Sequence, residues 1–158
     1  MIEPTAFIGC DPGATGYYCL VVPSTKYVEF YPNNTKPREI AQWLSVQKKK
    51  YSIAIVMIED VHTLFGMSAK SNFTFGRNVE KINVIPSIVG LSIDLVQPKV
   101  WQRFIGIKAK SKTIKQDVAV ICERLYPDVN IRGPKGGLKD GKSDALMLAH
   151  YASQTFIV

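Results

Sequence analysis

The sequence predicts an α/β fold, with one five-stranded mixed sheet and helices on both of its faces. Three observations lead to this prediction. β-Rich segments separated only by short turns come first, and amphipathic segments then alternate with short apolar runs. The most apolar run, residues 52–59, is too short and too rich in β-branched residues for a helix. A chain of 158 residues has room for one domain of ordinary size.

Three strands are expected first, over residues 5–11, 16–22 and 26–31. Residues 12–13 (Pro-Gly) end the first strand, and residues 23–25 (Pro-Ser-Thr) separate the second from the third. Connections this short join antiparallel neighbours, so the three strands should form a meander.

Helix and strand alternate in the middle of the chain. A helix is expected over about residues 37–50, opening on a proline, and residues 52–59 should be a central buried strand. After a loop over residues 62–72, apolar residues at helical spacing predict a helix over about residues 73–90, which a proline at position 86 kinks or divides. A fifth strand should follow over residues 92–96.

The last third of the chain is mainly helical. We expect a short helix over residues 101–105, an amphipathic helix over 112–125, a loop rich in Gly and Pro over 126–139, and a final helix from Asp140 or Ser143 to about residue 156. A meander followed by alternating helix and strand is the element order of the ribonuclease H-like fold. Residues 1–158 should therefore form a single domain of that fold.

The charge of the chain is segregated. Its net charge is +7, and the stretch from Lys99 to Lys142 holds eleven basic residues and four acidic ones. A localised positive field favours a polyanionic partner such as DNA or RNA. No apolar run is long enough for a membrane span, and the N-terminus lacks a signal-peptide pattern. Three scattered cysteines fit neither a disulfide framework nor a zinc site.

Four carboxylates stand at the ends of predicted elements. Asp11 ends the first strand, Glu59 ends the central strand, and Asp144 lies at the start of the last helix with Asp140 one turn before it. Acids clustered at buried positions repel one another, and a divalent cation removes that cost. Oxygen ligands without a His or Cys cluster favour Mg²⁺ or Mn²⁺, which can align water and phosphate for hydrolysis. The plainer alternatives are a turn residue for Asp11, a surface strand end for Glu59 and a helix N-cap for Asp140.

Several stretches of the sequence resemble RuvC-type Holliday junction resolvases, especially the short phage-like and virus-like members. Residues 9–17 (GCDPGATGY) resemble the first-strand motif, residues 55–61 (IVMIEDV) the fourth strand with its acid, and residues 140–149 (DGKSDALMLA) the last helix. Residues 98–102 (PKVWQ), with the following Gly106 and lysines, also fit. The order and spacing match over nearly the whole chain.

This resemblance implies a homodimeric, Mg²⁺-dependent nuclease that binds a four-way DNA junction and nicks two strands symmetrically, with Mn²⁺ also supporting activity. It implies catalytic and metal-binding roles for Asp11, Glu59 and Asp144. Gly141 occupies the family's usual position for the remaining acid, so Asp140 takes that role only if the helix start is slightly unwound. The resemblance also implies action in the cytoplasm of a bacterium or of a phage-infected host, and not secretion.

Basic and aromatic residues complete the predicted site. Lys112 or Lys115 resembles the family's active-site lysine, which steadies phosphate charge. His62 stands where the best-known members carry an aromatic residue, so stacking on bases at the junction centre is assigned instead to Phe65, Phe73 or Phe75. The residues expected to contact DNA are Lys108, Lys110, Lys112, Lys115, Arg77, Phe73 and Phe75. The family likeness also places the dimer face on the helix over residues 73–90.

Other functions compete with this one. An RNA-processing nuclease similar to the small YqgF-type proteins has the same fold, although their fourth strand does not usually end in Glu. A non-catalytic nucleic-acid-binding module needs only the basic surface. Residues 136–143 (GGLKDGKS) match the G-x-x-x-x-G-K-[ST] phosphate-binding loop, but no convincing strand precedes them. We therefore expect no nucleotide cofactor.

Overall fold

A computed structural model describes residues 3–62 and 66–156, in which five strands form one mixed sheet in the order β3-β2-β1-β4-β5. The strands are β1 (Thr5–Cys10), β2 (Tyr17–Val22), β3 (Tyr27–Pro32), β4 (Ser52–Glu59) and β5 (Ile93–Val96). β2 is antiparallel to both β1 and β3, whereas β4 is parallel to both β1 and β5. The predicted meander and five-stranded mixed sheet are confirmed.

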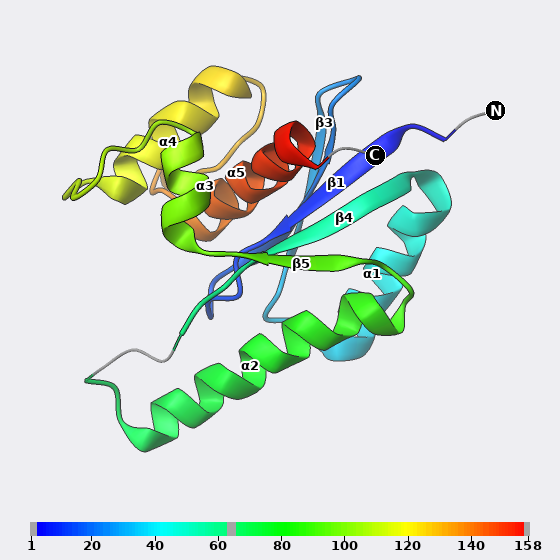
Figure 1. Ribbon diagram of the computed structural model, residues 1–158, viewed down its shortest axis with the longest axis horizontal. Coiled ribbons are helices and arrows are strands. Elements are labelled where there is room, and N and C mark those ends of the chain that lie inside the picture. Colours follow the sequence, from blue (N-terminus) through cyan, green and yellow to red (C-terminus); the bar gives the residue numbers. More distant parts are fainter. Residues whose placement is uncertain (1–2, 63–65, 157–158) are drawn as a thin grey trace.

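Five helices cover the two faces of the sheet, as predicted. They are α1 (Pro37–Lys50), α2 (Ala69–Ile88), α3 (Pro98–Phe104), α4 (Ile114–Leu125) and α5 (Asp140–Thr155). Figure 1 shows α3, α4 and α5 on one side of the sheet and α1 and α2 on the other. Along β1, Phe7 enters the core beneath the first group and Ile8 the core beneath the second, because successive strand residues face opposite sides. None of these helices, within the described residues, is long and apolar enough to cross a membrane.

Helix α2 differs most from the sequence prediction. It begins four residues earlier, at Ala69, because the Ser68 hydroxyl caps it by accepting a hydrogen bond from the Ser71 amide at 3.1 Å. It also continues through Pro86 without dividing. Proline removes the N–H that the carbonyl of Ile82 would accept, and the Tyr18 hydroxyl donates to that carbonyl instead, at 3.0 Å.

The two halves of α2 have different surroundings. Residues 69–77 contain no buried side chain, and Figure 1 shows this half reaching past the end of the sheet. In the other half, Ile82, Ile85 and Pro86 are buried against the sheet. The Asn78 amide donates to the carbonyl of Pro12 at 3.1 Å, which ties the helix to the loop after β1. The protruding half therefore extends from an anchored base.

The other helix boundaries move by smaller steps. α3 begins at Pro98, three residues before the predicted start, and α4 begins at Ile114. α5 begins at Asp140 and not at Ser143. Proline at the first helical position of α3 is favourable, because its missing N–H would have no partner there.

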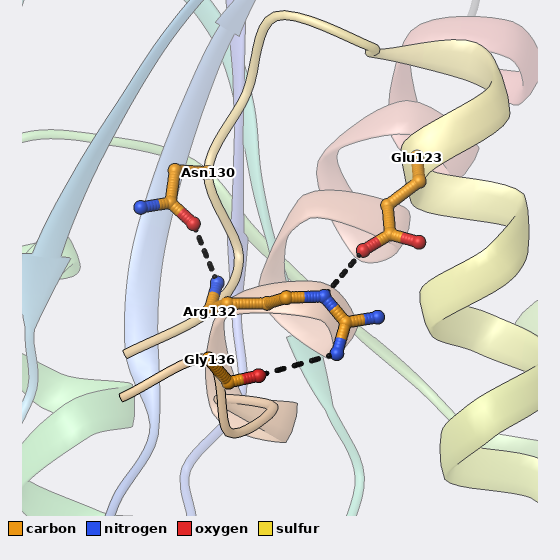
Figure 2. A network of polar contacts seen from close by, with 4 residues as sticks. All are labelled: Glu123, Asn130, Arg132 and Gly136. Carbon is orange, nitrogen blue, oxygen red and sulfur yellow. Dashed lines mark hydrogen bonds and ion pairs between the residues drawn. The ribbon is translucent and has the colours of Figure 1, made fainter. Parts of the chain in front are cut away.

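The loop between α4 and α5 is held by Arg132 (Figure 2). Its guanidinium donates to Glu123 at 2.7 Å and to the carbonyl of Gly136 at 3.4 Å, and its backbone N–H donates to Asn130 at 2.8 Å. Arg132 and Leu138 form an isolated β-bridge outside the main sheet. The segment before residues 136–143 is thus not the buried strand that a phosphate-binding loop needs.

Candidate active site

The topology brings Asp11 and Glu59 to the same edge of the sheet. β1 and β4 are parallel neighbours, with Cys10 opposite Ile58, so the two acids follow at the carboxyl ends of adjacent strands. α5 lies directly on β1. A Cβ added at Gly9 would stand 2.2 Å from the carbonyl oxygen of Ala145, so only glycine allows this close approach. This contact places Asp144 beside the end of β1.

Asp11, Glu59, Asp140 and Asp144, here called the acid cluster, share one electrostatic environment. Burial, together with the negative charges of Asp11, Glu59 and Asp140, raises the pKa of Asp144 to about 8. Burial likewise raises the pKa of Glu59 to about 7, with a smaller contribution from Asp11. Burial, followed by the charge of Asp140, also raises the pKa of Asp11. The carboxylates predicted from distant parts of the sequence therefore influence one another's protonation.

Lys115 is the lysine that lies at the acid cluster. It leaves the first turn of α4 and forms an ion pair with Asp140 at the start of α5. Its pKa is raised by the hydrogen bond and charge of Asp140, and further by Asp144 and Asp11. Lys112 is exposed in the loop before α4. The sequence left these two lysines unresolved, and the structure places Lys115 beside the acids.

The start of α5 fixes the positions of Asp140 and Gly141. Lys139 occupies the N-cap position, so Asp140 is the first helical residue and the N-cap alternative is wrong. A Cβ at position 141 would stand 2.3 Å from the carbonyl oxygen of Thr15, so this backbone accepts only glycine there. The close packing of α5 on the loop between β1 and β2 explains why an acid is missing at position 141.

Asn33 shapes the backbone around Asp11. This buried side chain donates from Nδ2 to the carbonyls of Asp11 at 2.6 Å and Gly13 at 3.1 Å. The Gly13 N–H in turn donates to the Asp11 carboxylate at 2.9 Å. Asn33 was not among the predicted site residues, because its position between Pro32 and Asn34 does not reveal a partner 22 residues earlier.

Trp101 is the hydrogen-bond donor of Glu59. The indole Nε1 lies 2.7 Å from Glu59 Oε2, and the Trp101 side chain is fully buried. β5 pairs with β4 so that Val96 stands opposite Glu59, and α3 then returns the chain over that end of the sheet. Trp101 was expected to open a short helix and lies in a stretch of family resemblance, but its contact with Glu59 was not predicted.

Apart from Lys112 and Lys115, the residues predicted to contact DNA lie on two separate surfaces. Lys108 and Lys110 are exposed in the loop between α3 and α4, where they line a hollow of about 700 Å³ together with Lys99 and Arg103. Its remaining lining residues are Pro98, Gln102, Ile107, Ala109 and Ile114. This hollow is here called the cationic hollow, and one of its lining residues, Ile114, is the first residue of α4, the helix that carries Lys115.

The second surface is the protruding half of α2. Phe73 is 68% exposed, and the guanidinium carbon of Arg77 lies 5.8 Å from the centre of its ring. Phe75 is half-buried on the same half of the helix. His62 is exposed, with Nε2 3.8 Å from the Asp60 carboxylate. Phe65, the remaining predicted stacking residue, lies outside the described residues.

The carboxylate oxygens of the acid cluster are suitable ligands for a hard divalent cation, but they are not already arranged around a common metal position. Within residues 3–62 and 66–156, no three Asp, Glu, His or Cys side chains already stand as ligands around one point. Mg²⁺ usually takes only one or two protein carboxylates and completes its shell with water and substrate phosphates. Half-buried carboxylates that raise one another's pKa supply the negative charge such an ion compensates. The predicted ligand set of Asp11, Glu59, Asp140 and Asp144 stays a prediction.

Comparison with solved structures identifies the fold. Thermus thermophilus RuvC in complex with a Holliday junction substrate superposes with a TM-score of 0.62 at 14% sequence identity, over 96% of each chain. A second T. thermophilus RuvC structure gives a TM-score of 0.57 at 13% identity, over 94% of this chain and 95% of the other. No family model and no curated protein sequence matches the chain. The chain therefore has the RuvC-like form of the ribonuclease H-like fold.

Proposed function

We propose that this protein is a structure-selective endodeoxyribonuclease that resolves four-way DNA junctions by metal-dependent phosphodiester hydrolysis. The observation that carries the proposal is the acid cluster, assembled from β1, β4 and α5 at one edge of the sheet. In two structures that share this fold, the protein is RuvC, and in one of them it is bound to a Holliday junction substrate. The basic stretch of the chain supplies the charge that a nucleic acid requires.

In the proposed site, Asp11, Glu59 and Asp144 would hold Mg²⁺, with Asp140 beside them. The ion would supply Lewis-acid chemistry, lowering the pKa of a water molecule and polarising the scissile phosphate. Asn33 and the Gly13 N–H keep the Asp11 loop in position. Lys115 contributes a fixed positive charge toward the phosphate, and Asp140 holds its ammonium group at the site.

The DNA backbone follows the cationic hollow in this proposal. Lys99, Arg103, Lys108 and Lys110 line it, and each places a positive charge where a phosphate oxygen can approach. Among the residues that the structure describes, no aromatic side chain lines the hollow, so it suits a sugar-phosphate backbone better than unstacked bases. Base stacking is assigned instead to the exposed Phe73, with Phe75 and Arg77 near it on α2.

A homodimer is proposed through the other half of α2. Ile88 is 74% exposed and Val84 38% exposed on this helix, while Leu95 on the edge strand β5 is 46% exposed. Such apolar residues are typical of a protein-protein contact. Sedimentation of the protein with and without junction DNA tests this part, and a monomer under both conditions would contradict it.

The decisive experiment is a cleavage gel with three end-labelled substrates: a four-way DNA junction, the linear duplex of one arm, and a structured RNA. We expect paired nicks in opposite strands of the junction with Mg²⁺ or Mn²⁺, and none with EDTA. Asp11→Asn keeps the shape of the side chain but removes its charge, so it should abolish cutting while junction binding in Ca²⁺ stays near normal.

The same gel separates the competing functions. Cutting of RNA but not of the junction would support an RNA-processing nuclease. Binding of the junction with no cutting under any metal would support a non-catalytic binding module. Undiminished cutting by purified Asp11→Asn would contradict the proposed site itself.

A further inference from the structure

Trp101 and Glu59 form a partly buried donor-acceptor pair that the nuclease reaction does not by itself require. The indole nitrogen has one N–H and no lone pair to offer, so it only donates. Its 2.7 Å bond to Oε2 occupies one oxygen of the carboxylate. Among the described residues, no donor is recorded on the other oxygen, Oε1. The contact thus divides the carboxylate into a held oxygen and a free one.

We infer that Trp101 is a positioning residue that orients the Glu59 carboxylate for divalent-cation binding. The inference rests on the proposed function, because it assigns Glu59 to the metal. A group that holds one carboxylate oxygen fixes the direction in which the other points. Such outer contacts to metal ligands typically change metal affinity by about 10- to 100-fold.

The chemistry of the indole suits this role. A lysine in the same place would neutralise Glu59 and compete with the cation for its charge, whereas the neutral indole leaves the full negative charge available. The hydrogen bond also favours the ionised carboxylate, opposing the burial that raises the pKa of Glu59. Full burial of Trp101 in the core beneath α3, α4 and α5 holds the donor rigidly.

The chain contains a matched control. It has two tryptophans, and the other, Trp43 on α1, donates from Nε1 to Glu29 Oε1 at 2.6 Å. Trp43 is only 8% exposed and packs on the opposite face of the sheet. The two indoles thus make nearly the same bond, one at the acid cluster and one remote from it. If both hydrogen bonds were purely structural, the two tryptophans should respond alike to metal binding, and removing either N–H should have the same effect on metal affinity.

The first test observes the wild-type protein. In ¹⁵N-labelled wild-type protein without DNA, the two indole N–H signals are followed by NMR during a Mg²⁺ titration, and Trp43→Phe assigns them. We expect the Trp101 signal to move with a saturable dependence on Mg²⁺ and the Trp43 signal to stay. Two unmoved signals, in a protein that binds Mg²⁺ by calorimetry, would overturn the inference.

The second test compares Trp101→Phe with Trp43→Phe by Mn²⁺ calorimetry on the DNA-free proteins. Each variant keeps the aromatic body and removes the N–H. Trp101→Phe should bind Mn²⁺ about tenfold or more weakly, and Trp43→Phe should bind it as the wild type does. Equal Mn²⁺ affinity of the two variants would contradict the positioning role, even if both lose thermal stability.

The two proposals fail in different ways. If the wild-type protein binds neither Mg²⁺ nor Mn²⁺, the metal-dependent function fails and the inference falls with it. If the wild type binds the ions and cuts the junction while the Trp101 variant binds them equally well, only the inference fails. Should Trp101→Phe not fold, the wild-type NMR titration decides alone.

Discussion

Lys115 in the first turn of α4 forms an ion pair with Asp140 in the first turn of α5, at the acid cluster. Lys115 remains 67% exposed, so this ion pair contributes little to folding. Its position is better explained by chemistry at the site than by stability. The pair also joins the start of α4 to the start of α5.

The Lys115→Ala variant tests that explanation. It should fold normally and lose roughly 100-fold in the cleavage rate constant, because a fixed charge facing a reacting phosphate is lost. Lys112→Ala is the control, since Lys112 is exposed and lies outside α4; it should cut at a near wild-type rate. Single-turnover cleavage of a labelled junction measures both. Equal rates for the two variants would remove Lys115 from the site.

The cationic hollow makes a prediction about salt. Neutralising Lys108 removes one phosphate contact, so the slope of log affinity against log salt should fall by about one unit. Arg132→Gln is a useful comparison, because Arg132 already binds Glu123 at 2.7 Å and should not contact DNA. Fluorescence anisotropy of junction binding in Ca²⁺, over a range of salt, gives both slopes. An unchanged slope for Lys108→Ala would move the DNA path elsewhere.

The raised carboxyl pKa values predict how stability depends on pH. Folding raises the pKa of Glu59 to about 7 and of Asp144 to about 8, both above their ordinary values. Between those ordinary values and the raised ones, the folded state keeps protons that the unfolded state releases. The metal-free protein should therefore lose stability as pH rises through this window, and the contribution of these groups is fully present only below it.

Urea unfolding in EDTA between pH 5 and pH 8 measures this trend. Asp144→Asn should flatten the dependence of stability on pH, because it removes the carboxyl group with the higher of the two raised pKa values. Mg²⁺ should stabilise the wild-type protein more at pH 8 than at pH 6, since it binds the ionised carboxylates. A stability profile that rises over this range for the wild type and for Asp144→Asn alike would contradict the electrostatic coupling of the acid cluster.

The hydrogen bond from Tyr18 to the carbonyl of Ile82 predicts a stability effect remote from the chemistry. Tyr18→Phe leaves that buried carbonyl, already deprived of a donor by Pro86, without a partner. The expected cost is about 1–3 kcal/mol in the free energy of unfolding. Tyr31→Phe is the control: Tyr31 packs on Trp43, and no hydrogen bond of its hydroxyl is recorded among the described residues. Equal unfolding midpoints for the two variants would refute this account of Pro86.

The fold was largely predictable from local patterns, and the site only in part. Asp11 and Glu59 could be found because each ends an apolar strand, a pattern visible within a few residues. Trp101 could not, because its partner lies 42 residues away and a short helix with one buried residue predicts nothing about where an indole N–H points. The start of α2 was missed for another reason. Residues 69–77 pack against no core, so their sequence lacks the helical spacing of apolar residues by which a helix is predicted.

Gly141 gives the sharpest test of how α5 meets the loop between β1 and β2. Replacing a helical glycine with alanine ordinarily stabilises a protein by about 0.5–1 kcal/mol. At position 141 the new Cβ would stand 2.3 Å from the Thr15 carbonyl oxygen and 2.9 Å from the Gly16 Cα, both backbone atoms that cannot turn aside. Gly141→Ala should therefore destabilise the protein, by about 1–3 kcal/mol.

Gly76→Ala provides the opposite expectation in the same chain. Gly76 lies inside α2, and a Cβ there would meet nothing within 4 Å, so this variant should gain the ordinary stabilisation of about 0.5–1 kcal/mol. Thermal and urea unfolding of the two variants compare them directly. If Gly141→Ala proves as stable as Gly76→Ala, α5 does not pack closely on Thr15. The absence of an acid at position 141 would then need a cause other than space.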